Sequence, residues 1–90
     1  MVVDVTQEHI DSGFKDDGFR CPFARALRPH IKLGLDPYVG STVVYIYDSE
    51  SYCVGRLNLP QKVTDFIVAY DKEFPVQPFT AEVMIPVEYR

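Results

Sequence analysis

Two runs of β-branched and aromatic residues limit most strictly what this chain can fold into. They cover residues 42–47 and 52–57, and only Asp-Ser-Glu-Ser at residues 48–51 separates them. A four-residue connection between two such runs predicts an antiparallel β-hairpin. Successive side chains of a strand point to opposite faces, so one face of the hairpin is available for burial and the other for contacts.

Two short helices are expected in the first third of the chain. Thr6 is placed to cap a helix over residues 7–12. Pro22 suits the first position of a second helix, because its missing N–H would have no partner there anyway. Pro29 would break a continuous helix at a cost of about 3 kcal/mol, so we expect this second helix to stop near Arg28.

The cleanest helical pattern follows residues 58–61, where asparagine, proline and glutamine form a helix start. We expect this helix to end before Pro75, and its apolar face recurs at helical spacing. That face consists of Val63, Phe66, Ile67, Tyr70 and Phe74. Alternating apolar residues predict two further strands, over residues 2–6 and 79–87.

The predicted order is therefore β, α, β, β, α, β in a chain of 90 residues, which is the size of one small domain. This order indicates a single α+β domain over residues 1–90. A four-stranded, mainly antiparallel sheet with helices on one face accounts for it, and the βαββαβ ferredoxin-like arrangement is the simplest version.

The sequence also indicates the cellular compartment in which the protein is expected. The start of the chain lacks the pattern of a signal peptide, and no apolar run is long enough to span a membrane. Two cysteines do not make a disulfide framework. We therefore expect a cytoplasmic protein with reduced thiols that does not bind membranes.

One segment, residues 18–35, carries no acidic side chain in a chain of net charge −4. Its four cations are Arg20, Arg25, Arg28 and Lys32. They could bind nucleic acid or another anion, or they could neutralise acids of the same molecule such as Asp65, Asp71 or Glu73. The surplus of acids favours the second interpretation.

Few residues suggest catalysis or metal binding. Cys21 precedes an expected helix start beside Arg20 and Arg25, which would favour a thiolate; the alternative is a small apolar cap residue. A zinc site would have to combine Cys21 and Cys53 with His9 and His30, which are scattered singly instead of forming close pairs. The common catalytic and phosphate-binding motifs are missing. We expect no enzyme and no cofactor.

The hairpin offers a better candidate for binding. If Tyr47 pairs with Tyr52, one face carries Val43, Tyr45, Tyr47, Tyr52, Val54 and Arg56. The other face, expected under the helices, carries Val44, Ile46, Cys53, Gly55 and Leu57. Tyr, Arg and Met are enriched in protein contacts, so the predicted protein-binding residues are Tyr45, Tyr47, Tyr52, Arg56 and Met84.

Two other uses of these tyrosines stay open. Termini and loops could cover them, or their rings could stack on single-stranded nucleic acid. Against the second use, the central strands lack the RNA-binding signature, and Asp4 and Glu82 would repel phosphate on the same face.

Four segments carry a resemblance to a known family. They are residues 5–13 (Val-Thr-Gln-Glu-His-Ile-Asp-Ser-Gly), residues 21–27 (Cys-Pro-Phe-Ala-Arg-Ala-Leu), Leu59-Pro60 with Phe66-Ile67 and Tyr70-Asp71, and residues 75–79 (Pro-Val-Gln-Pro-Phe). With these segments the chain resembles a family of small bacteriophage and prophage proteins of unknown function. The resemblance brings no catalytic motif and implies expression in a bacterial host.

Together these features predict a non-enzymatic accessory protein of bacteriophage type that acts by protein–protein binding. The expected partners are a second copy, in a homodimer built on the tyrosine face, and a host protein that it would inhibit. The alternative function is nucleic-acid binding through the basic segment, residues 20–32.

Overall fold

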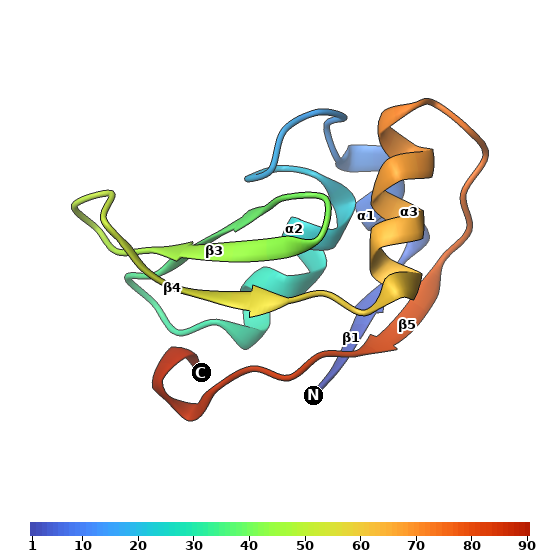
Figure 1. The fold of residues 1–90 in the computed structure, drawn as a ribbon. Helices are drawn as coiled ribbons and strands as arrows, with labels where there is room; N and C mark the ends of the chain where they lie inside the picture. Colours follow the sequence, from blue (N-terminus) through green and yellow to red (C-terminus); the bar gives the residue numbers. More distant parts are fainter.

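In the computed structural model, which describes all 90 residues, five strands form two separate antiparallel sheets (Figure 1). The strands are β1 (Val2–Val5), β2 (Asp36–Val39), β3 (Val43–Tyr47), β4 (Cys53–Asn58) and β5 (Phe79–Glu82). The helices are α1 (Gln7–Ser12), α2 (Pro22–Leu27) and α3 (Gln61–Asp71), with 3₁₀ turns η1 (Arg28–His30) and η2 (Val87–Tyr89). The α+β class is thus confirmed.

The division into two sheets differs from the predicted architecture. β1 pairs only with β5, while β2, β3 and β4 form a meander in that order. The single four-stranded sheet and the ferredoxin-like arrangement are therefore not confirmed. The β1–β5 pair joins segments more than 70 residues apart, as in the register of Val2 with Glu82, and local sequence patterns carry no information about such long-range pairing.

β2 is the strand that the sequence did not reveal. It is only four residues long, contains Pro37, and lies at the edge of the meander. Proline cannot donate to a strand ladder, so a proline in a short run argues against a strand unless the strand lies at an edge. Along β2 the burial alternates, with Pro37 and Val39 buried and Asp36 and Tyr38 exposed.

The predicted hairpin is present, with a different register. Tyr45 pairs with Arg56, and a bulge beyond Ile46 places Tyr47 opposite Cys53. The bulge overturns one expectation, because Cys53 is exposed instead of lying under the helices. The connecting turn is held by Asp48, whose Oδ1 accepts the N–H groups of Glu50 and Tyr52 at 2.9 and 3.0 Å.

The first two helices follow the sequence closely. Thr6 caps α1 and accepts the His9 N–H at 3.3 Å, while His9 Nδ1 accepts the Thr6 N–H at 3.0 Å. α2 starts at Pro22 and ends before Arg28, where the 3₁₀ turn η1 accommodates Pro29. The predicted stop of this helix is thus confirmed.

The third helix is shorter at both ends than expected. Pro60 is its N-cap residue, and the helix ends at Asp71 because Glu73 adopts a left-handed conformation with φ of 62°. The N–H groups of Glu73 and Phe74 turn back to the carbonyls of Tyr70 and Ala69, which is the pattern of a Schellman cap. Phe74 therefore leaves the buried face and is exposed.

The C-terminal strand is also shorter than predicted. It ends at Glu82, and the chain continues extended to Pro86 before η2. Ala81, Val83 and Ile85 are buried as expected, whereas Val87 is exposed. Tyr89 packs so closely over β4 that a side chain at Gly55 would collide with its ring.

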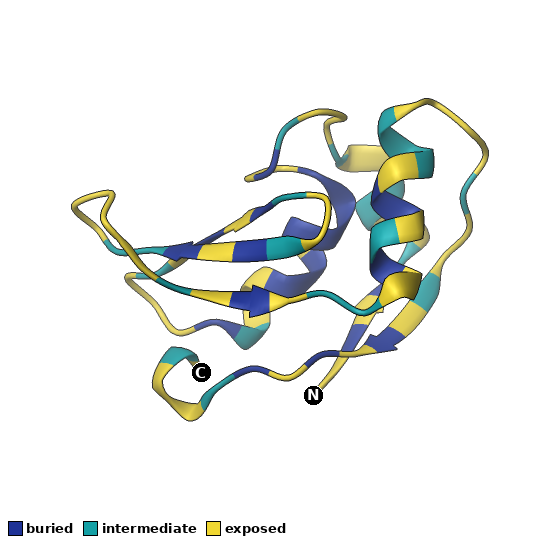
Figure 2. Ribbon diagram, in the orientation of Figure 1, coloured by how far each residue is buried: buried dark blue, intermediate teal, exposed yellow.

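The core lies around α2, which packs against β1 of one sheet and β2 of the other. Phe23 and Leu27 of this helix are fully buried, and the inner face of the meander adds Val44, Ile46 and Leu57. Figure 2 shows buried positions alternating with exposed or half-buried ones along β3. No helix in the structure is both long and apolar enough to cross a membrane.

Candidate functional site

The outer face of the meander is the strongest candidate for a binding surface. The strand register places Tyr38 of β2, Tyr45 of β3 and Arg56 of β4 in one row across the sheet. Tyr38 and Tyr45 are each 36% exposed, while their neighbours along the strands point into the core. Helix α2 packs against this sheet at β2, and the two tyrosine rings are partly exposed to solvent.

Three of the rings support one another. Phe19, from the loop before α2, packs edge-on against Tyr38 with ring centroids 4.8 Å apart. Tyr47 completes the group at 6.2 Å from Phe19 and 6.4 Å from Tyr38. These separations lie within the range of favourable aromatic pairs. We call the set of Phe19, Tyr38, Tyr45, Tyr47 and Arg56 the open aromatic face.

The side-chain hydroxyl and guanidinium groups on this face have no hydrogen-bond or ion-pair partner within the chain. The only tyrosine hydroxyls that donate hydrogen bonds are those of Tyr70 and Tyr89, both outside the face. No carboxylate lies within 4.0 Å of the Arg56 guanidinium. The open aromatic face therefore combines apolar rings with free donors, which is the composition of protein-binding hot spots.

Two of the predicted binding residues lie outside this arrangement. Tyr52 precedes β4 at the end of the hairpin loop and makes no ring contact with the other tyrosines. Met84 is exposed, but it follows β5, which belongs to the other sheet. The prediction placed Met84 on the tyrosine face because it assumed a single sheet.

Phe19 and Tyr38 are the residues of the face that the sequence did not indicate. Tyr38 was not predicted because β2 was not predicted. The signal was present, since Asp36–Val39 alternates between outward polar or aromatic residues and inward apolar ones. Phe19 lies in a loop, where no periodic pattern exists. The Val39 N–H donates to Gly18 at 2.8 Å, and this bond fixes the loop beside β2.

The basic segment does not act as one patch. Arg28 pairs with Asp36 at 2.7 Å, and Arg20 lies 3.9 Å from Asp17. Arg25 and Lys32 are exposed and make no ion pair. Two of the four cations thus pair with acids of the same chain. The partners are Asp17 and Asp36, and not the expected Asp65, Asp71 or Glu73.

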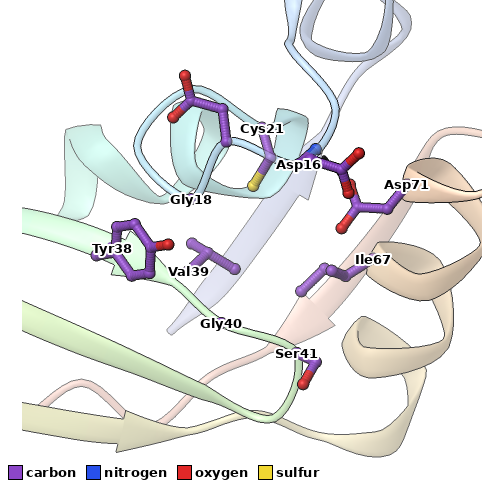
Figure 3. A pocket seen from close by; sticks show the side chains of 10 residues that line it. Asp16, Gly18, Cys21, Tyr38, Val39, Gly40, Ser41, Ile67 and Asp71 are labelled. Atoms are coloured by element: carbon purple, nitrogen blue, oxygen red, sulfur yellow. Dashed lines mark hydrogen bonds between the residues drawn. The ribbon is translucent and has the colours of Figure 1, made fainter.

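A hollow of about 200 Å³ lies between the loop before α2, the β2–β3 turn and α3. Figure 3 shows the Cys21 sulfur and the Tyr38 hydroxyl pointing into it, with Asp16 and Asp71 together at its other end. The Asp16 N–H donates to Asp71 Oδ1 at 3.0 Å. Asp17 also lines this hollow.

The surroundings of Cys21 are the reverse of those expected for a reactive thiol. Burial raises the pKa of the Cys21 thiol above its ordinary value, and the negative charges of Asp71 and Asp17 add to the rise. Hydrogen bonds from the N–H groups at the start of α2 lower the pKa by less. The predicted thiolate-favouring site is therefore not supported, and Cys21 belongs to the buried core.

The histidines and cysteines do not converge on a metal site. His9 serves the cap of α1, Cys21 is buried, and Cys53 is exposed on β4. Nowhere do three or more histidine, cysteine or acidic side chains form a group suited to a metal ion.

Comparisons with protein families, with curated proteins and with solved structures found no match. The function therefore has to be inferred from the chemistry of the surfaces.

Proposed function

We propose that this protein acts by binding other proteins through the open aromatic face, and that a second copy of the chain is one such partner. The observation that carries the proposal is the cluster of Phe19, Tyr38 and Tyr47, whose rings pack on one another. Phe19 and Tyr38 are exposed, and Tyr47 is half-buried. Rings held by neighbours lose little conformational freedom on binding, so most of their contact energy contributes to affinity.

A two-fold symmetric contact suits this surface. In such a dimer the same patch of each copy meets the other, so the tyrosines of one copy would pack on those of its partner. Tyr45 lies in the centre of the meander, between Tyr38 and Arg56. Central aromatic and arginine residues contribute most of the binding energy in protein contacts.

The test is sedimentation equilibrium at about 50 µM, where a contact with a micromolar Kd is largely formed. We expect a dimer for the wild type and a monomer for the double variant Tyr45→Ser/Tyr47→Ser. Circular dichroism should show the variant folded, because both side chains lie on the outer face. Tyr52→Ser is the matched control and should leave the dimer intact. A wild type that sediments as a monomer would contradict the proposal.

A host protein as a further partner, a bacteriophage origin and a bacterial cytoplasmic location stay predictions. Nucleic-acid binding is the weaker alternative because Arg20 and Arg28 are already paired with carboxylates. It predicts a band shift of DNA or RNA that weakens steeply with salt. An unshifted band at low salt would remove this alternative.

A further inference from the structure

The open aromatic face is chemically asymmetric across the strands. Its one cation, Arg56, lies on β4 at one edge of the meander, while Tyr38 lies on β2 at the other edge. Phe19 and Tyr47 pack against Tyr38, with ring centroids 4.8 and 6.4 Å from its own. We call Phe19, Tyr38 and Tyr47 the ring cluster. Two strand spacings, about 10 Å, separate the backbones of Tyr38 and Arg56.

Arg56 has no partner in its own chain. Its side chain is exposed, and no carboxylate lies within 4.0 Å of the guanidinium. The side-chain hydrogen bonds and cation–π contacts within the chain involve other cations, although Tyr45 is the direct neighbour of Arg56 across the strands. A guanidinium is weakly hydrated and stacks readily on aromatic faces. Arg56 is therefore free to take a ring from another chain.

The ring cluster is the surface that complements Arg56. Phe19 is 42% exposed, Tyr38 is 36% exposed and Tyr47 is half-buried. The π electrons of such rings attract a guanidinium that lies over them. The charged side chains beside the cluster are in ion pairs and leave no net charge there: Arg28 with Asp36 at 2.7 Å and Arg20 with Asp17 at 3.9 Å.

The symmetry of a dimer decides which residues meet. When two sheets pack face to face in the aligned way, the two-fold axis runs either along the strands or across them. An axis along the strands exchanges the two edges, so β4 of one copy faces β2 of the other and Arg56 meets the ring cluster. An axis across the strands keeps each edge opposite itself, so Arg56 meets Arg56. Facing like charges disfavour the second arrangement.

We propose that Arg56 determines how two copies dock, by stacking on the ring cluster of the second copy with the two-fold axis parallel to the strands. This inference rests on the proposed function, because it requires a dimer that forms through the open aromatic face. The symmetry repeats the contact on both sides of the axis, and Tyr45 lies between the two contacts. Arg56 is therefore the residue that makes a second copy fit better than a purely apolar surface would.

The first test measures the Kd of the dimer by sedimentation equilibrium at several concentrations. Arg56→Leu keeps an apolar side chain and removes the guanidinium, so the Kd should rise about tenfold because two cation–π contacts are lost. Arg25→Leu is the matched control, since Arg25 is exposed on α2 and makes no ion pair. The control should leave the Kd unchanged. An unchanged Kd in Arg56→Leu would overturn the inference.

An exchange of charges distinguishes the two axes. Under the proposed axis, Tyr38→Arg alone brings two cations together and Arg56→Glu alone removes the cation, so each should weaken the dimer. The double variant Tyr38→Arg/Arg56→Glu should restore it, because each arginine then faces a glutamate of the other copy. An axis across the strands would instead place arginine on arginine. If circular dichroism shows all three variants folded and the double variant dimerises no better than the single ones, the inference is wrong.

A second measurement needs no variant and so does not depend on whether Tyr38→Arg folds. Isotope-labelled and unlabelled wild type are mixed in equal amounts, and isotope-filtered NOE spectra then report only contacts between chains. We expect contacts that join the Arg56 side chain to the rings of Phe19, Tyr38 or Tyr47. Contacts between chains that join Arg56 to none of these rings would contradict the proposed docking.

Failure of this inference and failure of the proposed function give different results. A wild type that stays monomeric contradicts both. A wild-type dimer that dissociates in Tyr45→Ser/Tyr47→Ser, but keeps its Kd in Arg56→Leu, leaves the proposed function intact and overturns the role of Arg56 alone.

Discussion

The two faces of the meander differ in what their side chains contact, although they belong to the same strands. Ile46 is fully buried, whereas Tyr45, its neighbour in β3, is 36% exposed. The inner side chains gain their free energy during folding, because folding removes them from water. The outer ones retain apolar area that only a partner can bury. The inner side of this strand therefore contributes to stability, and its outer side belongs to the surface that we propose for binding.

The largest effect should come from shortening an inner side chain. Ile46→Ala removes buried methyl groups and leaves a cavity, so the free energy of unfolding should fall by about 2–5 kcal/mol. Tyr45→Ala on the outer face should lower it by less than about 1 kcal/mol. Urea unfolding followed by circular dichroism at low micromolar concentration, where the proposed dimer would contribute little, measures both. Equal losses would show that Tyr45 also belongs to the core.

A smaller effect is expected where the inner face is covered by the C-terminal segment. Gly55→Ala would push a methyl group into the ring of Tyr89, and overpacking of this kind costs about 1–3 kcal/mol. Because the ring is the end of a flexible side chain, we expect the lower part of this range. In the Tyr89→Ala background the same change should cost much less. A double-mutant cycle of unfolding free energies tests this prediction. If Gly55→Ala costs the same with and without Tyr89→Ala, the Tyr89 ring is not the source of the collision.

The smallest effect concerns pH and separates the two cysteines. Burial raises the pKa of Cys21 in the folded state, so above about pH 8.5 the unfolded chain loses its thiol proton first. The free energy of unfolding should be unaffected by this group below that pH and should fall as the pH rises further. Tyr70, whose pKa burial also raises, adds to the fall at higher pH.

Urea unfolding at pH 7 and pH 9.5 measures this slope. Cys21→Ala should make the fall shallower, whereas Cys53→Ala, which removes the exposed thiol, should leave it unchanged. If both variants change the fall of the unfolding free energy with pH equally, the assignment of Cys21 to the buried core is contradicted.

Most local elements of this fold, with the exception of β2, were predictable from sequence. The caps of α1, the stop of α2 at Pro29 and the burial of Val44, Ile46 and Leu57 all depend on residues close together in the chain. Pairing across the chain was not predictable. The strand order was not predicted, and no local pattern shows that β1 and β5 form a sheet separate from the meander, so the prediction placed all strands in one sheet.

Part of the candidate site was predictable for the same reason. Tyr45 and Arg56 were placed on one face because the hairpin alternates regularly there, and in the observed register, which differs from the predicted one, they are direct partners. Cys53 was misplaced because a bulge changes the alternation, and a bulge depends on how the turn closes. Phe19 was missed because a loop residue reaches the sheet only through a tertiary contact. Phe74 was misplaced on the buried helix face because Glu73, and not a glycine, adopts the left-handed conformation that ends α3 and turns Phe74 outward.

The pairing of Val2 with Glu82 also sets an order of events in time. The meander closes through short connections, whereas β1 and β5 must close a loop that includes most of the chain, which costs more entropy and slows folding. During synthesis, β1 is made before β5 and has no strand partner until residues 79–82 have been made. We therefore expect the meander to form early and the two ends of the chain to join last.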